Sequence, residues 1–212
     1  LVTAGSIMPH IRRADAAIVW GAGIITRADV FERPREIRAV RGPLTRARCL
    51  ALGYDCPEIY GDPAILLPRH LDLSAVPVTG DLGLVPHFVN LDEANRLFAD
   101  RPGIRIIDVR RPLPEVSAEI AACRAIVSSS LHGVIVAQAY GRPAARVTFA
   151  APLKGDGVKF ADHYAAFGIT DAPDPARLDG SEATSDLIAL AESAPRPNID
   201  ALTDRLAEAC PF

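Results

Sequence analysis

The sequence predicts an α/β protein made of two Rossmann-like units, in which helices cover both faces of parallel sheets. Short, continuously apolar runs alternate with helical patterns along almost the whole chain. Strands that are buried on both faces have this continuous apolar character, and their alternation with helices is typical of parallel sheets. The chain has 212 residues, of which 49% are hydrophobic and 23% charged, so it is long enough for one ordinary domain or two small ones.

In the first part of the chain, glycine and proline delimit the predicted elements. The apolar run at 16–20 is a short strand that stops at a glycine, and a second strand at 37–40 leads into a Gly-Pro pair. Proline is favourable in the first turn of a helix, and a glycine ends the helix predicted at 44–52. A short apolar segment at 64–67 follows and ends at a proline.

In the second part of the chain the alternation is sharper, and it begins after a linker at 69–80. The strands predicted there are residues 82–85, 104–109, 125–127 and 144–149, and the helices are residues 91–99, 114–123, 131–140 and 159–167. A loop rich in Asp, Pro and Gly at 170–182 precedes two closing helices, at 183–192 and 199–209.

These elements divide the chain into three predicted parts. Residues 1–75 form a partial N-terminal Rossmann-like unit, and residues 76–175 form a C-terminal Rossmann-like unit. Residues 176–212 form C-terminal helices that pack back on the first unit. The chain opens on an apolar segment without Met, which reads as the interior of a strand. We therefore expect the first unit to be truncated at its N-terminus.

Composition excludes several classes of protein. The net charge of −3 gives no general support for nucleic-acid binding, which is usually accompanied by a basic excess. No apolar run approaches the ~20 residues that span a bilayer, and no signal peptide is visible. The four cysteines form no CxxC pair, and we expect no metal site. The predicted location is cytoplasmic, and a substrate at the inner face of the membrane stays open.

The strongest local signal lies where the predicted strand 125–127 meets the helix 131–140. The residues at this junction are Ser128, Ser129, Ser130, Leu131, His132 and Gly133. Hydroxyl groups and the free N–H groups of a helix start, at the carboxyl end of a parallel strand, favour a bound anion. His132 can donate to that anion or move a proton near neutral pH, and Gly133 permits close approach. The alternative is that the serines only cap the helix and His132 is a surface residue.

Four further residues are candidates for the same kind of site. Arg41 lies between a strand and a helix, where its planar fork can hold a carboxylate or phosphate. His87 follows another strand and is either structural or directed at the same crevice. Asp62 either caps the segment after it or contacts the site, and Lys159 can add positive charge. The fingerprints of dinucleotide-binding, P-loop and zinc-protease sites are absent.

Several of these segments also form an ordered set. They are Val-Trp-Gly-x-Gly at 19–23, Arg-Ala-Val-Arg-Gly-Pro-Leu-Thr-Arg at 38–46, Tyr-Gly-Asp-Pro-Ala at 60–64, Val-Pro-His-Phe-Val at 85–89, Ser-Ser-Ser-Leu-His-Gly at 128–133, Ala-Tyr-Gly-Arg-Pro at 139–143 and Lys-Phe-x-Asp-x-Tyr at 159–164. In this order the set resembles the bacterial polysaccharide pyruvyl transferase family. The resemblance covers about residues 4–168. It implies a two-domain fold similar to that of GT-B glycosyltransferases, with the active site between the domains.

The resemblance also implies a reaction. Pyruvate is transferred from phosphoenolpyruvate to a sugar diol as a ketal, in exopolysaccharide or cell-wall polysaccharide biosynthesis, with no cofactor besides this donor. It implies that Arg41 and His132 face the donor as catalytic residues. The acceptor is a saccharide, and whether a lipid carries it stays open.

The chain departs from the family pattern at its start, where the N-terminal Asn-x-Gly-Asp type of loop is missing. Two alternatives therefore remain. One is a GT-B-like glycosyltransferase that uses a nucleotide sugar, and the other is an inactive, shortened relative that binds saccharide.

Overall fold

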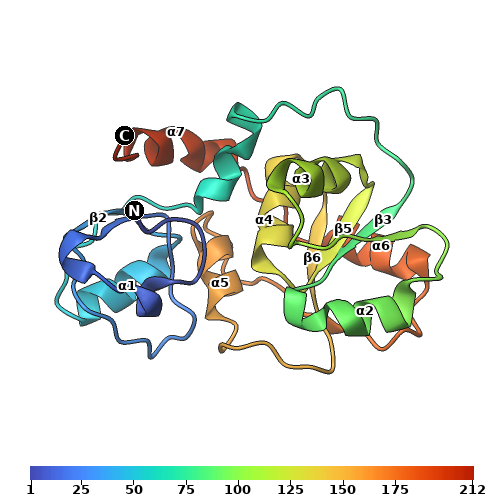
Figure 1. Ribbon diagram of the computed structural model, residues 1–212, viewed down its shortest axis with the longest axis horizontal. Helices are drawn as coiled ribbons and strands as arrows, with labels where there is room; N and C mark the ends of the chain where they lie inside the picture. Colours follow the sequence, from blue (N-terminus) through green and yellow to red (C-terminus); the bar gives the residue numbers. More distant parts are fainter. The chain divides into compact units, whose positions relative to one another are not determined.

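The computed structural model describes residues 1–212, and the chain divides into two compact units. Unit 1 comprises Leu1–Leu66, Lys154–Ala172 and Pro197–Phe212, and unit 2 comprises Leu67–Leu153 and Pro173–Arg196. Each unit contains a parallel sheet and helices that pack on it (Figure 1). The predicted α/β class with parallel sheets is confirmed.

The sheet of unit 1 is small. Strands β1 (Ile18–Trp20) and β2 (Glu36–Ala39) pair in parallel, with a register shift between Val19 and Trp20. Single parallel bridges add Val2 beside β1 and Tyr60 beside Val40, so the extended segments follow chain order across the sheet. This order is what short crossover connections between parallel segments produce.

The helices of unit 1 enclose an apolar core. They are η1 (Met8–His10), η2 (Ala14–Ala16), α1 (Pro43–Ala51), η3 (Pro63–Arg69, which leads into unit 2), α5 (Val158–Ala165) and α7 (Asp200–Glu208). Val19 and Val40 of the sheet segments pack with Cys49 of α1 and Val158 of α5. As predicted, α1 begins with a proline in its first turn and is followed by a glycine, Gly53, in the left-handed region.

The sheet of unit 2 has five parallel strands in the order β4–β3–β5–β6–β7. These strands are β3 (Leu82–Val85), β4 (Ile104–Ile106), β5 (Ala125–Ser128), β6 (Ala144–Thr148) and β7 (Ala176–Arg177). Because β4 lies on one side of β3, whereas β5, β6 and β7 follow in succession on the other side, the strand order reverses between β3 and β5. In open α/β sheets, ligands bind at the carboxyl ends of the strands where the order reverses.

Helices cover both faces of this sheet. They are η4 (Phe88–Asn90), α2 (Leu91–Phe98), α3 (Leu113–Ala122), α4 (Leu131–Ala139) and α6 (Thr184–Ser193). Leu84 and Val127 pack with residues of α2 and α6, whereas Gly83 and Ile126 lie on the opposite face, beside Cys123 after α3. This alternation is the two-residue period of β-strands. No helix in the chain combines the length and the apolar character that crossing a bilayer requires.

The course of the chain differs from the predicted division at two places. The segment with α5 belongs to unit 1, because its apolar and acidic side chains pack and bond there. The two C-terminal helices separate: α7 belongs to unit 1, whereas α6 packs on β5 and β6 of unit 2 through Leu187 and Ala191. The predicted loop at 170–182 also contains a short strand, β7, which pairs with Val147 and Thr148.

Candidate active site

Ser128, the last residue of β5, is buried and bonds within unit 2. Its hydroxyl lies 2.6 Å from the carbonyl oxygen of Val85 and 2.8 Å from that of Ser130, and it accepts a hydrogen bond from the Ser130 N–H at 3.0 Å. These bonds fix the end of β5 to the end of β3 and shape the turn into α4. Ser128 therefore sets the backbone geometry of the predicted anion site.

Ser129 extends this connection along the carboxyl edge of the sheet. Its buried hydroxyl accepts a hydrogen bond from the His87 N–H at 2.9 Å and donates to Oδ1 of Asn90 at 3.0 Å. The Asn90 amide in turn donates to the carbonyl oxygen of Ala151 at 2.9 Å. Sequence reasoning missed Asn90, because a single amide near a strand end has no distinctive pattern.

The hydroxyls of Ser128 and Ser129 bond to protein groups, so the groups of this segment that can bind an anion lie at the start of α4. Ser130 is the N-cap residue in extended backbone conformation, and it makes no side-chain cap to the helix. The first-turn N–H groups of an α-helix have no acceptor within the helix, and the helix dipole adds about half a positive charge at this end. Leu131 is buried, and His132 is half-buried in this first turn.

Gly133 brings α4 close to the sheet. A Cβ atom at this position would overlap Oγ of Ser128 and lie 2.8 Å from Cγ1 of Val85. Gly133 thus allows close approach, as predicted, and it is helix α4 that approaches the ends of the strands. It places the first turn of α4 directly over the ends of β3 and β5.

His87 lies at the carboxyl end of β3 and is half-buried. Its Nδ1 accepts a hydrogen bond from the Val89 N–H at 3.3 Å, so a neutral ring carries its proton on Nε2. The ring stacks against Phe88 with 4.3 Å between centroids. The main-chain bond to Ser129 and this cap hold His87 at the same edge as the start of α4.

Arg146 is a cation that sequence reasoning missed. The register of β5 and β6 pairs it with Ser128, and it is half-buried. Its neighbours Ala145 and Val147 belong to the core under α6, so alternation places Arg146 on the face that α4 covers. The pattern at 144–149 indicated only a strand, and no local signal identified its one charged residue.

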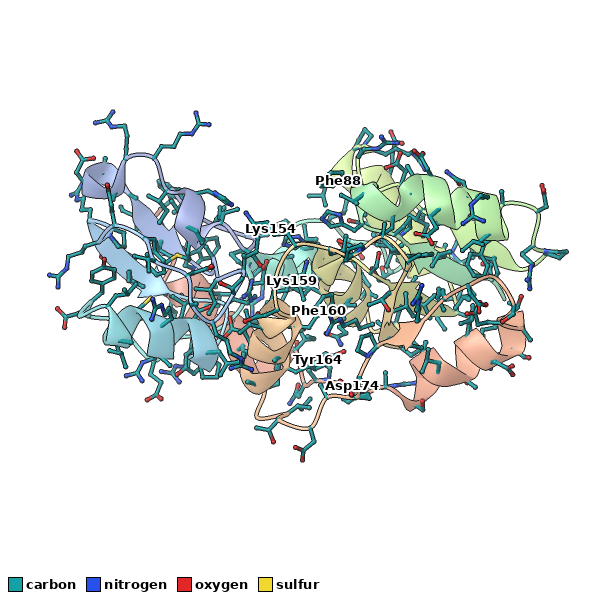
Figure 2. All side chains as sticks on the ribbon, turned by 90° about the horizontal axis from the view of Figure 1, so that it is seen from below. Phe88, Lys154, Lys159, Phe160, Tyr164 and Asp174 are labelled. Atoms are coloured by element: carbon teal, nitrogen blue, oxygen red, sulfur yellow. The ribbon has the colours of Figure 1, made fainter.

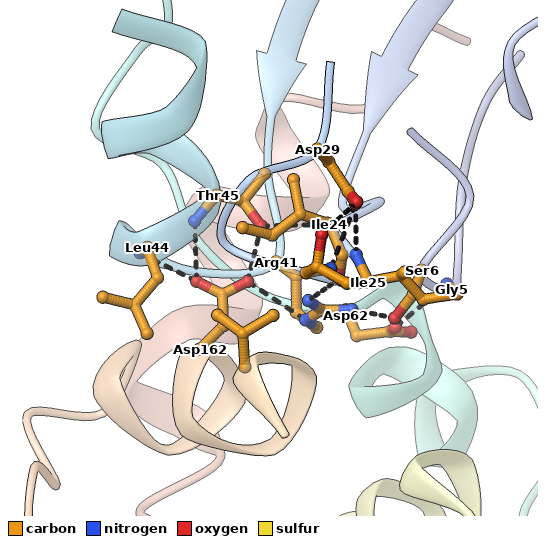
Figure 3. Close-up of polar contacts among 12 residues, drawn as sticks. Gly5, Ser6, Ile24, Ile25, Asp29, Arg41, Leu44, Thr45, Asp62 and Asp162 are labelled. Atoms are coloured by element: carbon orange, nitrogen blue, oxygen red, sulfur yellow. Dashed lines mark hydrogen bonds and ion pairs between the residues drawn. The ribbon is translucent and has the colours of Figure 1, made fainter. Parts of the chain in front are cut away.

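In unit 1, Arg41 is completely buried and its guanidinium is enclosed by hydrogen bonds (Figure 3). It donates from Nε to Asp162 at 3.1 Å, from Nη1 to the Ser6 hydroxyl at 2.7 Å and from Nη2 to the carbonyl oxygen of Ile24 at 2.8 Å. Burial lowers the pKa of Arg41, and the carboxylates of Asp162 and Asp62 oppose this shift. That Arg41 contacts a ligand stays a prediction. In the structure its guanidinium already donates hydrogen bonds to three groups of the protein.

Asp162 of α5 joins this arginine to the start of α1. Its Oδ1 accepts hydrogen bonds from the N–H groups of Leu44 at 2.8 Å and Thr45 at 3.0 Å, and its Oδ2 accepts from the Thr45 hydroxyl at 2.6 Å. A carboxylate from another helix thus caps α1, where the dipole favours negative charge. Gly42 permits this contact, because a Cβ atom there would overlap the backbone of Asp162.

Asp62 and Lys159 complete the predicted set in unit 1. Asp62 is buried, and its side chain accepts hydrogen bonds from the N–H groups of Ala64 at 3.1 Å and Gly5 at 3.3 Å. The first of these bonds is the capping contact that the sequence offered as one interpretation. Lys159, labelled in Figure 2, is half-buried in the first turn of α5, with its ammonium 5.5 Å from the centroid of the Phe160 ring.

The structure therefore gathers the predicted residues in two groups, one in each unit. Unit 2 brings Ser128, Ser129, Ser130, His132 and His87 together at the carboxyl edge of its sheet. Unit 1 places Arg41 and Asp62 in one buried polar network, to which Asp162 belongs. No group of three or more His, Cys, Asp and Glu side chains is placed to hold a metal ion.

A protein-family model matches most of the chain. The polysaccharide pyruvyl transferase model matches residues 12–148, a range that includes the Arg41 junction, the end of β3 and the whole Ser128–Gly133 segment. The chain belongs to the polysaccharide pyruvyl transferase family. The resemblance seen in the sequence is therefore confirmed.

Two curated proteins are similar to this member of the family. An uncharacterized protein, L143, of Acanthamoeba polyphaga mimivirus is 30% identical over 158 residues, which are 72% of this chain and 55% of that protein. The succinoglycan biosynthesis protein ExoV of Rhizobium meliloti (strain 1021) is 29% identical over 181 residues, 82% of this chain and 55% of that protein. The chain thus spans about half the length of these relatives. No solved structure matches it.

Proposed function

We propose that the chain takes part in pyruvyl transfer from phosphoenolpyruvate to a sugar diol, which forms a cyclic pyruvate ketal on a saccharide. The observation that carries the proposal is the start of α4, where His132 lies in the first turn of a helix without a side-chain cap, at the carboxyl edge of the sheet. Membership of the family and similarity to a succinoglycan biosynthesis protein support it. We also propose that the fold is similar to that of GT-B glycosyltransferases.

The donor suits this end of α4. Phosphoenolpyruvate carries a phosphate and a carboxylate, and helix N-termini bind such groups through main-chain N–H donors and the helix dipole. Ser128 and Ser129 serve the site indirectly, since their hydroxyls hold the backbone that presents these donors. Arg146, paired in register with Ser128, adds positive charge on the face covered by α4.

His132 supplies the proton that starts the reaction. Protonation of the methylene carbon of phosphoenolpyruvate makes C2 electrophilic, and the first sugar hydroxyl adds there and returns its proton to the imidazole. The second hydroxyl then attacks C2, and the C–O bond to phosphate breaks as the ketal closes. The proton of this hydroxyl leaves with inorganic phosphate, so the donor and the diol supply all atoms of the products.

In this proposal Arg41 and Asp162 act within unit 1, where they hold its loops and the start of α1 in place. Their buried pair holds the loop residues Ser6 and Ile24 to one side and the start of α1 to the other. Arg41 therefore acts through its neighbours, and its substitution is expected to impair folding as well as turnover.

Phosphate release tests the proposal. The chain is incubated with phosphoenolpyruvate and methyl β-D-galactopyranoside, whose 4- and 6-hydroxyls form a suitable diol, and phosphorus NMR follows inorganic phosphate. We expect release that depends on the sugar and falls by about 100-fold or more in His132→Gln, the usual range for loss of a general acid. The exposed His10 gives the matched control, and His10→Gln is expected to retain turnover.

Two outcomes would overturn the proposal. One is full turnover by His132→Gln. The other is thermal stabilisation of the chain by a nucleotide sugar but not by phosphoenolpyruvate, because that result would indicate a glycosyltransferase.

A further inference from the structure

We propose that Phe88, with His87 beside it, is the platform on which a pyranose ring of the acceptor saccharide stacks. This inference rests on the proposed function, since that function supplies the saccharide. It concerns a residue that neither the sequence patterns nor the proposed chemistry assigned, and it gives the acceptor a place in unit 2.

Phe88 is a large apolar residue that is mostly exposed instead of packed in the core. Phe88 is 58% exposed and the next residue, Val89, is 49% exposed, although the strand before them is fully buried. Phe88 is labelled in Figure 2. Exposed apolar groups that lie together on a protein surface often mark a binding site. Single exposed apolar residues are common, however, so exposure alone does not identify a ligand.

The second observation is that the aromatic pair is held in place. The rings of His87 and Phe88 are 4.3 Å apart with 34° between their planes. The His87 N–H donates to the Ser129 hydroxyl, and Nδ1 of His87 accepts from the Val89 N–H. A surface that is already ordered loses little side-chain freedom when a ligand binds, which increases affinity.

The position of the pair connects it to the proposed chemistry. His87 follows β3 directly, and Ser129, its hydrogen-bond partner, is the residue before the N-cap of α4. Both residues therefore lie along the carboxyl edge where the strand order reverses, which is the usual ligand edge of such sheets. A sugar on Phe88 would reach the edge that carries His132.

The chemistry of the pair fits a saccharide better than the donor. A pyranose ring presents an apolar face of C–H groups and a rim of hydroxyls, and an aromatic face is the natural contact for the former. The small trianionic donor gains nothing from an apolar ring, and cations and N–H groups suit it instead.

Sugar binding in the absence of phosphoenolpyruvate tests this inference separately from the reaction. Saturation-transfer NMR with methyl β-D-galactopyranoside measures affinity for the wild type, Phe88→Ala and Phe88→Trp. We expect affinity about fivefold to tenfold weaker in Phe88→Ala and nearly unchanged in Phe88→Trp, since a single aromatic contact has this order of strength. Val78→Ala, at an equally exposed apolar residue that precedes β3 and so lies away from the carboxyl edge, is the matched control and should bind like the wild type.

Kinetics give a second readout. With saturating phosphoenolpyruvate and varied sugar, Phe88→Ala should raise KM for the sugar by the same factor and leave kcat unchanged. With saturating sugar and varied phosphoenolpyruvate, KM for phosphoenolpyruvate should be unchanged. If sugar binding depends on Phe88 but no turnover occurs in the wild type, the platform stands and the proposed function fails. If turnover occurs and sugar binding is the same in Phe88→Ala, the platform is wrong and the proposed function stands.

Binding to a membrane surface is the competing role for an exposed aromatic residue. Co-sedimentation with vesicles of phosphatidylcholine and phosphatidylglycerol distinguishes it. Vesicle binding that is lost in Phe88→Ala, together with sugar binding that is unaffected, would overturn the inference.

Discussion

Asp162→Asn removes one charge from the buried centre of unit 1 and changes little else. Asparagine keeps one acceptor oxygen, so the hydrogen bonds from the N–H groups of Leu44 and Thr45 can persist. The carboxylate oxygen that accepts from Nε of Arg41 and from the Thr45 hydroxyl is replaced by an amide that cannot accept from either. Arg41 then remains buried without its ion-pair partner, and only the carboxylate of Asp62 still opposes its positive charge.

The expected loss of stability follows from this geometry. Both side chains of the ion pair are completely buried, and removal of one partner from such a pair typically costs about 3–5 kcal/mol. The loss of negative charge at the start of α1 adds a smaller amount, of order 0.3–1 kcal/mol. Because folded domains are stable by about 5–15 kcal/mol in total, we expect a large shift of the unfolding midpoint.

Urea unfolding measured by tryptophan fluorescence is the assay. The chain has one tryptophan, Trp20 in β1, whose indole N–H donates to the carbonyl oxygen of Leu206 at 2.8 Å, so the signal reports on unit 1. Asp156→Asn is the control, because Asp156 is an exposed acid that accepts hydrogen bonds from two main-chain N–H groups of the same unit. It loses one hydrogen-bond acceptor and should cost about 0.5–1.5 kcal/mol.

Equal midpoints for Asp162→Asn and Asp156→Asn would refute the reasoning. Arg41→Met combined with Asp162→Asn gives a further check. If the buried pair is the source of the effect, the double variant should lose less stability than the sum of the two single variants.

Three other changes test unit 2. Gly133→Ala should cost about 1–3 kcal/mol, because its methyl group would overlap Ser128 and Val85, whereas Gly80→Ala, which meets no atom, should be near neutral by urea unfolding. Ser129→Ala leaves the part-buried His87 N–H without its acceptor and the buried Asn90 Oδ1 without its donor, and should lose about 1–3 kcal/mol in thermal unfolding. Burial raises the pKa of Cys123 from 9.0 to about 11. The folded chain therefore holds a proton that the unfolded chain releases between these values, and stability should fall across this pH range. The decline should be shallower in Cys123→Ala, and equal slopes would contradict the assignment.

The general architecture could be predicted because strands that are buried on both faces appear in the sequence as continuous apolar runs. The strands β3, β5 and β6 are continuously apolar over most of their length, and this pattern predicts the ends of each to within a residue. Strand β7 could not be predicted, since its two residues extend only because they pair with β6, in a segment of turn-forming composition. The placement of α6 was equally inaccessible, because an apolar helical face does not specify which sheet it covers.

The candidate site shows the same division between local and long-range information. The strand–serine–helix junction is local, so the start of α4 and the position of His132 could be predicted. The pair of Arg41 and Asp162 joins residues 121 positions apart, and nothing near either residue identifies the other. The burial of Ser128 and Ser129 depends on β3 and Asn90, which approach only in the folded sheet.

The identity of the pyruvyl donor is the central claim, and isotope transfer tests it most directly. Phosphoenolpyruvate labelled with carbon-13 at C2 is incubated with the chain and methyl β-D-galactopyranoside, and the saccharide is analysed by mass spectrometry and carbon NMR. The account predicts that the saccharide gains the mass of one pyruvate less one water, with the label in a ketal carbon and one phosphate released per transfer. Label that ends in free pyruvate, with the saccharide unchanged, would contradict it.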